Sequence, residues 1–215
     1  SGCDWSSDVC SSDLLQILFF IVKTFERNYL FLVVLGGRAD KANVELHDVR
    51  WVVGSQIEDT FNDLRNNWFG SIDGLHIDSF KKIEYIDGYK INLKIFDKNK
   101  IKNKQSTNEI NSQQNLWFVN IGGYDPSSMQ EKHEFGLVVA SSSLEAKNRA
   151  KSKWLKGCRK KHKDDIASLN KLISCDDCQL IKNIGSWEIE LILENNLPAE
   201  TNFPDWYGYR RIDKI

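Results

Sequence analysis

The sequence lacks the features that mark several large classes of protein. Its 29 lysines and arginines balance its 30 aspartates and glutamates, leaving a net charge of −1, so overall charge indicates neither a nucleic-acid nor an anionic-membrane partner. The apolar stretch at 14–22 is too short to span a bilayer. The five cysteines are odd in number and do not indicate a disulfide framework. The remaining composition, 41% hydrophobic and 27% charged, is typical of a soluble globular protein, and we expect it to be cytoplasmic.

Familiar catalytic signatures are also missing. Gly36-Gly37-Arg38 follows an apolar run and could cradle an anion on backbone N–H groups. However, it has neither the G-x-G-x-x-G nor the G-K-[ST] frame, and a plain turn is the favoured interpretation. No Ser-His-Asp order or nucleophile elbow is present. These absences leave the question of an enzyme open, with a non-enzymatic protein favoured.

The first 28 residues are expected to stand apart from the fold. Residues 4–14 read DWSSDVCSSDL, which resembles one reading frame of a common sequencing adapter. The apolar residues at 14–22 follow acidic rather than basic residues, which does not fit a signal peptide. We interpret residues 1–28 as an assembly artefact with translated upstream sequence.

An internal duplication organises the rest of the chain. An offset of 86 residues aligns 30–80 with 116–166 without a gap, and matches Gly36-Gly37 with Gly122-Gly123 and Trp68 with Trp154. The sequence has four histidines, and this one offset pairs them all, His47 with His133 and His76 with His162. The same offset matches Glu45 with Glu131 and Asp78 with Asp164. After Asp78, about twelve extra residues in the second copy restore the match.

The residue pattern in each copy predicts a β-β-α-β-β unit. An apolar run ends at Gly36-Gly37, and a second strand covers 47–53, whose alternate residues from His47 share one apolar face. Ser55 with Glu58, and Ser142 with Glu145, have the spacing of helix capping boxes. Strands at 75–86 and 89–96 meet at Asp87-Gly88, a hairpin dipeptide. We predict an α+β protein of two such units, related by a pseudo-twofold axis, each with an antiparallel sheet and a helix on one face.

After the N-terminal segment, the predicted layout has four parts. The first unit covers 29–96, a polar linker 97–115, the second unit 116–193, and a tail 194–215 that docks on the core through its aromatic residues. An insertion near 165–179 in the second unit is predicted to hold a short helix.

Several segments resemble a bacterial family catalogued as domain of unknown function 1543. They are LGGRADKANVELHDVRWVVG, IEDTFNDLRNNWFG, GLHIDS, DGYKINL and the tail PDWYGY. The resemblance covers 30–210 and implies one or two copies of a small unit per chain, which agrees with the duplication. It implies a soluble bacterial protein and no particular activity.

Two sets of residues could bind a metal at equivalent positions. The first is His47, His76 and Asp78, and the second is His133, His162 and Asp164. A His-x-Asp pair on a strand places both side chains on one face, and imidazole with carboxylate suits a divalent transition metal. The alternative, which we favour, is that the histidines make structural hydrogen bonds at strand ends. No cofactor is therefore predicted.

Two further sets carry weaker alternatives. Cys158, His162, Cys175 and Cys178 could form a four-ligand zinc site, although His76, the counterpart of His162, has no cysteine nearby. Basic residues between 147 and 163 could contact nucleic acid, but a solvated helix face is the usual meaning of such a run. These are Lys147, Arg149, Lys151, Lys153, Arg159, Lys160 and Lys161.

The function predicted from these observations is a non-enzymatic binding module. Twinned units form a groove between them, and ligand pockets favour such interfaces, so the expected partner is a small molecule or a protein in that groove. A metal-dependent enzyme using the histidine and aspartate sets is the alternative, and a nucleic-acid-associated protein is third.

Overall fold

The computed structural model describes residues 27–96, 114–125, 127–156, 160–161, 178–197, 201 and 203–214. We call β1 to β5 the first half and β6 to β11 the second half. The first half consists of β1 (Tyr29–Gly37), β2 (Leu46–Gly54), η1 (Ile57–Thr60), α2 (Phe61–Asn67), β3 (His76–Ile83), β4 (Tyr85–Ile86) and β5 (Tyr89–Ile95). The second half consists of β6 (Asn115–Tyr124), β7 (Lys132–Ala140), α3 (Ser143–Lys153), β8 (Lys160–Lys161), β9 (Cys178–Ile181), β10 (Asn183–Ile184) and β11 (Trp187–Leu193). The last strand, β12 (Trp206–Arg211), follows them.

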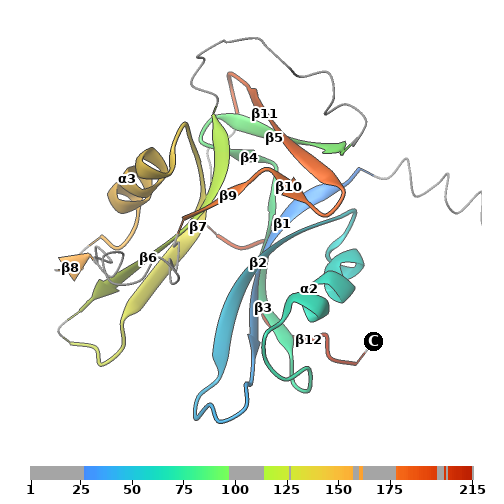
Figure 1. Cartoon of the computed structure of the whole chain (residues 1–215), viewed down its shortest axis with the longest axis vertical. Coiled ribbons are helices and arrows are strands. Elements are labelled where there is room, and N and C mark those ends of the chain that lie inside the picture. Colours follow the sequence, from blue (N-terminus) through green and yellow to red (C-terminus); the bar gives the residue numbers. More distant parts are fainter. Residues whose placement is uncertain are drawn as a thin grey trace, which may run out of the picture.

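The described residues form an α+β fold with three antiparallel sheets, as Figure 1 shows. The first sheet has the order β12-β3-β1-β2. Its central strand β1 is apolar on both faces, as expected of a strand that is covered on both sides. Phe31, Val33 and Leu35 pack with Leu64 and Trp68 of the α2 region, while Leu30 faces the second half.

The second half repeats this arrangement with a different helix surface. Strands β7, β6 and β8 form a sheet in which β9 also pairs with β6. Helix α3 packs on one face of this sheet, where its buried residues are Ala146 and Ala150. In Figure 1, α2 and α3 lie on the outer sides of the two sheets, and the inner faces meet in a shared core.

The third sheet corrects one expectation from the sequence. We expected the four strands of each unit to form a sheet of their own, but the order β10-β11-β5-β4 joins strands of both halves. β5 and β11 pair along their length, from Trp187 opposite Ile95 to Leu193 opposite Tyr89. Each strand thereby covers the exposed edge of the other, which removes unpaired backbone groups from two edges at once.

Strand pairings in the second half follow those of the first at constant offsets. Gly36 lies opposite His47, and Gly122 lies opposite His133, 86 residues later. Leu30 lies opposite Ile83, and Leu116 lies opposite Ile181, so the third strand is shifted by twelve further residues. These registers match the offsets read from the sequence.

Two local predictions were wrong. The Gly36-Gly37 pair is not a turn, because both residues continue β1 and pair with β2. The predicted Ser55–Glu58 capping box is replaced by Asp59, whose carboxylate accepts hydrogen bonds from the Ser55 hydroxyl (2.5 Å) and the backbone N–H of Ser55 and Gln56. An Asp one residue further along reaches these donors, which leaves Glu58 to pair with Arg210.

Other local predictions agree with the structure. Ser142 caps α3 and accepts a hydrogen bond from the backbone N–H of Glu145, which is one half of the predicted capping box. The Glu145 carboxylate accepts instead from the hydroxyl and backbone N–H of Ser141. Asp87 and Gly88 have φ values of 51° and 85° between β4 and β5, which is the conformation of a type I′ hairpin turn. The described residues leave out most of three predicted segments, namely 1–26 of the N-terminal segment, 97–113 of the linker and 165–177 of the insertion that is predicted to hold a short helix.

No helix in the described part of the chain is both long and apolar enough to cross a membrane.

Candidate metal centre and inter-half cavity

A cluster of ionisable side chains lies at one end of the first sheet, where β1, β2 and β3 meet. His47 and His76 both lie opposite Gly36, from β2 and β3 respectively. Asp78 falls at a β-bulge, because Val34 pairs with Ser79 and Leu35 with Ile77. A bulge redirects a side chain locally, and here the Asp78 carboxylate lies beside both histidines.

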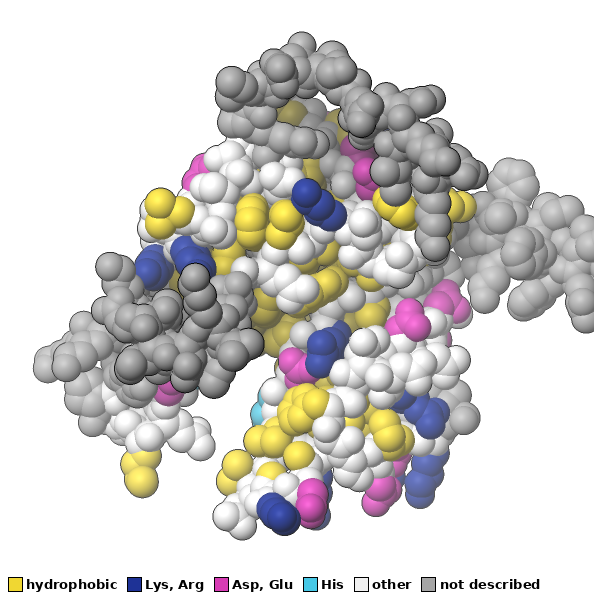
Figure 2. All heavy atoms as spheres, in the orientation of Figure 1, with side chains coloured by type: hydrophobic (Ala, Val, Ile, Leu, Met, Phe, Trp, Pro, Cys, Tyr) yellow, Lys and Arg dark blue, Asp and Glu magenta, His cyan; other side chains and the backbone are white. Residues whose placement is uncertain are grey.

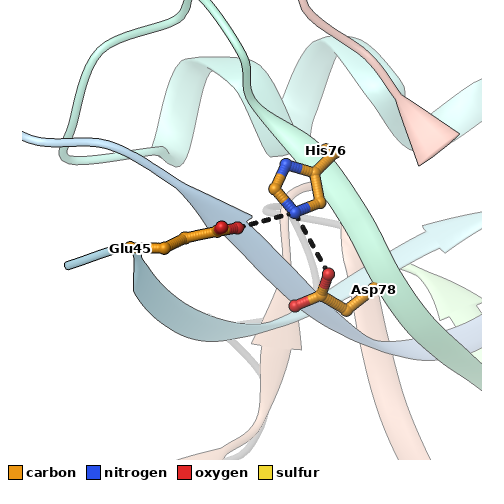
Figure 3. A group of neighbouring side chains, drawn as sticks. All are labelled: Glu45, His76 and Asp78. Atoms are coloured by element: carbon orange, nitrogen blue, oxygen red, sulfur yellow. Dashed lines mark ion pairs between the residues drawn. The ribbon is translucent and has the colours of Figure 1, made fainter. Parts of the chain in front are cut away.

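Glu45, just before β2, completes the cluster. The Nε2 atom of His76 lies 2.8 Å from Oε1 of Glu45 and 3.1 Å from Oδ1 of Asp78, as Figure 3 shows. The other Asp78 oxygen lies 3.2 Å from Nε2 of His47. The structure therefore brings His47, His76 and Asp78 together and adds a second carboxylate that the sequence argument did not include.

The orientation of His76 is fixed from behind. Its Nδ1 atom lies 2.8 Å from the carbonyl oxygen of Gly74. A carbonyl oxygen only accepts hydrogen bonds, so Nδ1 carries the hydrogen and Nε2 faces the two carboxylates. The His76 side chain is 4% exposed, whereas Glu45 is exposed. The cluster thus has a buried imidazole at its base and open carboxylates above it.

The C-terminal strand closes the cluster from another side. The ring of Tyr209 lies over the His76 ring, with 4.0 Å between centroids. Asp213 accepts a hydrogen bond from the backbone N–H of Gly74, whose φ of 82° favours glycine. The side chain of Arg211 also donates to Asp213 and holds its pKa well below the usual range. The tail therefore positions the loop that orients His76.

Gly36 provides the space for the cluster. A Cβ atom at Gly36 would lie 2.5 Å from Nε2 of His76 and 2.6 Å from Oε1 of Glu45. Gly122 is in the same relation to Glu131, whose Oε1 a Cβ would approach to 2.1 Å. A glycine inside a strand often marks such a close approach, and this explains the Gly-Gly pair that resembled a turn.

The second half keeps part of the cluster. His133 lies opposite Gly122 as His47 lies opposite Gly36, and its Nε2 is 3.6 Å from Oε2 of Glu131. The Nδ1 atom of His133 contacts the amide of Asn120 at 3.3 Å. His162 and Asp164 lie outside the described residues. Among the residues described, only Glu45, His76 and Asp78 place three metal-binding atoms within 4.8 Å of one another.

Of the four residues of the predicted zinc site, only Cys178 lies in the described part of the chain. Cys178 lies in β9, is buried in the core beneath α3, and directs its Sγ towards the carbonyl oxygen of Ser143 at 3.8 Å. Cys158, Cys175 and His162 lie outside the described residues, so this site stays a prediction.

The predicted basic face is partly occupied by internal contacts. Arg149 donates to Glu145 at 2.6 Å and to the carbonyl of Val139 at 2.8 Å, and Lys153 pairs with Asp87. The side chain of Lys151 also has a partner, Lys147 is half-buried on α3, and nothing is described for the side chains of Arg159, Lys160 and Lys161. These contacts compete with phosphate for the same guanidinium and ammonium groups, and nucleic-acid binding stays a prediction.

A cavity of about 430 Å³ lies between the two halves. Its walls come from β1, β3 and β4 of the first half, from β7 and the end of α3 in the second half, and from the tail at Thr201 and Pro204. In Figure 2 the two arms of the molecule are parted by a hollow with hydrophobic side chains at its inner end. His133 is on its lining, whereas His47 and His76 are not.

The apolar wall of the cavity is built from both halves. It includes Leu32 and Val34 from the first half and Phe135, Leu137 and Trp154 from the second. The shared core beside it continues into a contact between the rings of Trp51 and Phe118, whose centroids are 4.9 Å apart. The row of alternate residues that begins at His47 therefore faces the other half.

Comparison with known proteins identifies the family. The model for a Domain of Unknown Function, DUF1543, matches this sequence over residues 42–93 and again over 128–181. The chain belongs to the DUF1543 family. The two matched segments fall in the two halves, as expected of two copies. No curated protein matches.

A solved structure supports the fold. The DUF1543 chain is similar to the crystal structure of a protein Il1583 from Idiomarina loihiensis, with 28% sequence identity and a TM-score of 0.58. The match covers 86% of this chain and 98% of the Idiomarina protein. Neither comparison assigns an activity to the cluster or to the cavity.

Proposed function

We propose that this DUF1543 protein is a binding module that holds a small, largely apolar molecule in the cavity between its two halves. The observation that carries this proposal is a cavity of about 430 Å³ with walls from both halves. This volume falls within the range of small-molecule sites. A ligand there would contact Leu32 and Val34 on one side and Phe135 and Leu137 on the other.

The charged side chains around the cavity already have partners within the protein, and this favours an uncharged ligand. Lys81 donates to the Thr201 hydroxyl and to the carbonyl oxygen of Phe203. Glu134 accepts a hydrogen bond from the backbone N–H of Leu155 at 2.6 Å, and Lys153 pairs with Asp87. Since these groups are satisfied, the free energy of binding would come mainly from burial of apolar surface.

The same proposal includes the finer architecture, in which the halves are two copies of one β-β-α-β-β unit about a pseudo-twofold axis. Its support is the β5–β11 register, where Ile91 lies opposite Leu191 and Leu93 lies opposite Ile189. An offset of 98 residues exchanges these two pairs. It also places Asn92 opposite its own counterpart Glu190, at the position of the axis. Asn92 donates a hydrogen bond to Glu190 at 2.7 Å.

The test fills the cavity with a side chain. Val34 is half-buried and lines the cavity, so Val34→Trp should occupy the space and abolish saturable binding of the neutral fluorescent dye Nile red. Val44 is 67% exposed and is not on the lining, so Val44→Trp is the matched control and should bind as the wild type does. Equal binding by both variants, or no saturable binding by the wild type, would overturn the proposal.

A further inference from the structure

We propose that Glu45, His76 and Asp78 bind a divalent first-row transition-metal ion, with His47 holding the free oxygen of Asp78. This site is separate from the inter-half cavity, and neither proposal depends on the other. The three ligand atoms are Oε1 of Glu45, Nε2 of His76 and Oδ1 of Asp78, and they lie within 4.8 Å of one another.

The charge of the cluster is the first argument. Nδ1 of His76 donates to Gly74, so the neutral ring would present a lone pair to two carboxylate oxygens at 2.8 Å and 3.1 Å. Lone pairs at these distances repel unless a positive charge lies between them. Even a doubly protonated ring carries one positive charge against two negative ones. In the described part of the chain, neither Glu45 nor Asp78 has a lysine or arginine partner, and a divalent cation would balance the cluster.

The second argument is the orientation of the imidazole. Metal-binding histidines characteristically donate their other ring N–H to a carbonyl or carboxylate, which fixes the ring and the tautomer. His76 does this with the Gly74 carbonyl, and the neighbouring ring of Tyr209, tilted by 34°, restricts it further. A buried imidazole held by a loop and an aromatic ring is pre-organised, so little conformational entropy remains to be lost on binding a metal.

The donor atoms indicate the class of metal. One imidazole nitrogen with two carboxylate oxygens suits zinc, manganese, iron, cobalt or nickel in the divalent state, rather than the soft ions that thiolates prefer. Glu45 and His47 lie on the exposed side of the cluster. The remaining coordination positions would therefore face solvent, which is the arrangement of an open site rather than a closed structural one.

The glycine at the centre is the third argument. The Gly36 position has no room for a Cβ beside Nε2 of His76 and Oε1 of Glu45. The absence of a side chain at this position of the strand therefore leaves space for the imidazole and the carboxylate. Glycine inside a strand costs stability, and an ordinary side chain here would separate the imidazole from the carboxylate.

The experiment titrates metal-free protein with Co²⁺ and with Zn²⁺. Equilibrium dialysis counts the bound ions, and the visible absorption of bound Co²⁺ reports its ligands. The test variant is the full chain carrying Asp78→Asn. This substitution removes one charged ligand without changing the shape of the side chain. Loss of an outer partner of a metal ligand typically weakens binding about 10–100-fold, so loss of this direct ligand should weaken it at least about 100-fold. Glu45→Gln, at an exposed position, should weaken it in the same direction.

His133→Ala is the matched control, because His133 is the counterpart of His47 and does not contact the proposed ligands. The wild type should bind one equivalent that disappears in Asp78→Asn and persists in His133→Ala. Unchanged thermal unfolding of the metal-free variants would show that they are folded. The proposal is overturned if folded wild type binds no equivalent that depends on Asp78, or if the Co²⁺ spectrum shows thiolate charge transfer, which would assign the ion to cysteines. A proton would then be the charge that joins the cluster.

Discussion

The two halves solve the same packing problem with different side chains. On the first sheet, the helical region presents Leu64 and Trp68, and on the second, α3 presents Ala146, Ala150 and Trp154. Leu64 and Ala150 are equivalent at the offset of 86 residues, and both are fully buried. An alanine stripe allows a helix to lie closer to a sheet than a leucine stripe does. The two halves therefore share their strand registers, while the helix side chains packed against the sheets differ in size.

The C-terminal strand β12 is a second difference between the halves. β12 pairs with β3 of the first half, buries Ile212 and places Tyr209 against His76. The strand thus joins the first half, where the Glu45, His76 and Asp78 cluster is assembled. The C-terminal strand therefore adds an aromatic contact to the His76 cluster of the first half.

Leu64→Ala tests the difference between the two helix surfaces, and we expect it to have the largest effect on the free energy of unfolding. It places the alanine found at the equivalent position of the second half in the first half, where the neighbouring side chains are packed around a leucine. Leu→Ala substitutions in well-packed cores cost about 2–5 kcal/mol, and Leu64 is fully buried, so a loss in this range is expected in urea unfolding. Ala150→Leu should also destabilise the protein, by about 1–3 kcal/mol through overpacking. Stabilisation by either change would show that the two helix surfaces are interchangeable.

Substitutions at Asp87 test the contact between the two halves, and we expect an intermediate effect on the free energy of unfolding. Its carboxylate accepts a hydrogen bond from the backbone N–H of Val139 at 2.9 Å and pairs with Lys153. Glycine and asparagine both suit the positive φ of this turn, so Asp87→Gly removes the acceptor without straining the backbone. We expect a loss of about 1–3 kcal/mol for the unsatisfied N–H, measured by urea unfolding. Asp87→Asn keeps an acceptor and should lose less, and equal losses would contradict this role of the carboxylate.

The smallest effect concerns the start of α3. The pKa of Glu145 is lowered from 4.5 to about 2, because Ser141 donates to its carboxylate through both hydroxyl and backbone N–H, and Arg149 adds a further hydrogen bond. A depressed folded-state pKa contributes stability above the unfolded value, and this contribution is lost as pH falls from about 4.5 to about 2. Thermal unfolding of Glu145→Gln should therefore change less across this interval than unfolding of the wild type.

Ser141→Ala sharpens this test. It removes the hydroxyl that contributes most to the shift, so the acid-induced loss of stability should be smaller and should be complete at a higher pH than in the wild type. The same pH profile in both proteins would assign the depression to other groups. The equivalent contact in the first half runs from Ser55 to Asp59, which indicates that both helices begin with the same type of cap.

Much of the fold could be predicted from the sequence because it depends on local patterns. The apolar run of β1, the β2 strand and the Asp87-Gly88 hairpin all follow from side-chain periodicity and turn chemistry. The β5–β11 sheet could not be predicted in this way. It depends on which edges meet when the two halves associate, and no periodicity within one strand records its partner.

The candidate site shows the same division. The proximity of His47, His76 and Asp78 was expected from strand spacing, and the structure brings them together. Glu45 was missed although its recurrence as Glu131 was visible in the sequence, because it precedes the strand and has no fixed face. Tyr209 could not be placed, since its contact with His76 depends on the tail pairing with β3. Gly36-Gly37 was misinterpreted because glycine marks both turns and close approaches.

The proposed metal site is tested most directly by an anomalous difference map from crystals of the full chain grown with Co²⁺, measured at the cobalt absorption edge. A cobalt ion bound by the cluster should give a peak at about 2 Å from Nε2 of His76 and from oxygens of Glu45 and Asp78, the distance usual for such ligands. An ordered His76 cluster without a peak at that position, or a peak among the cysteines instead, would contradict the proposed site.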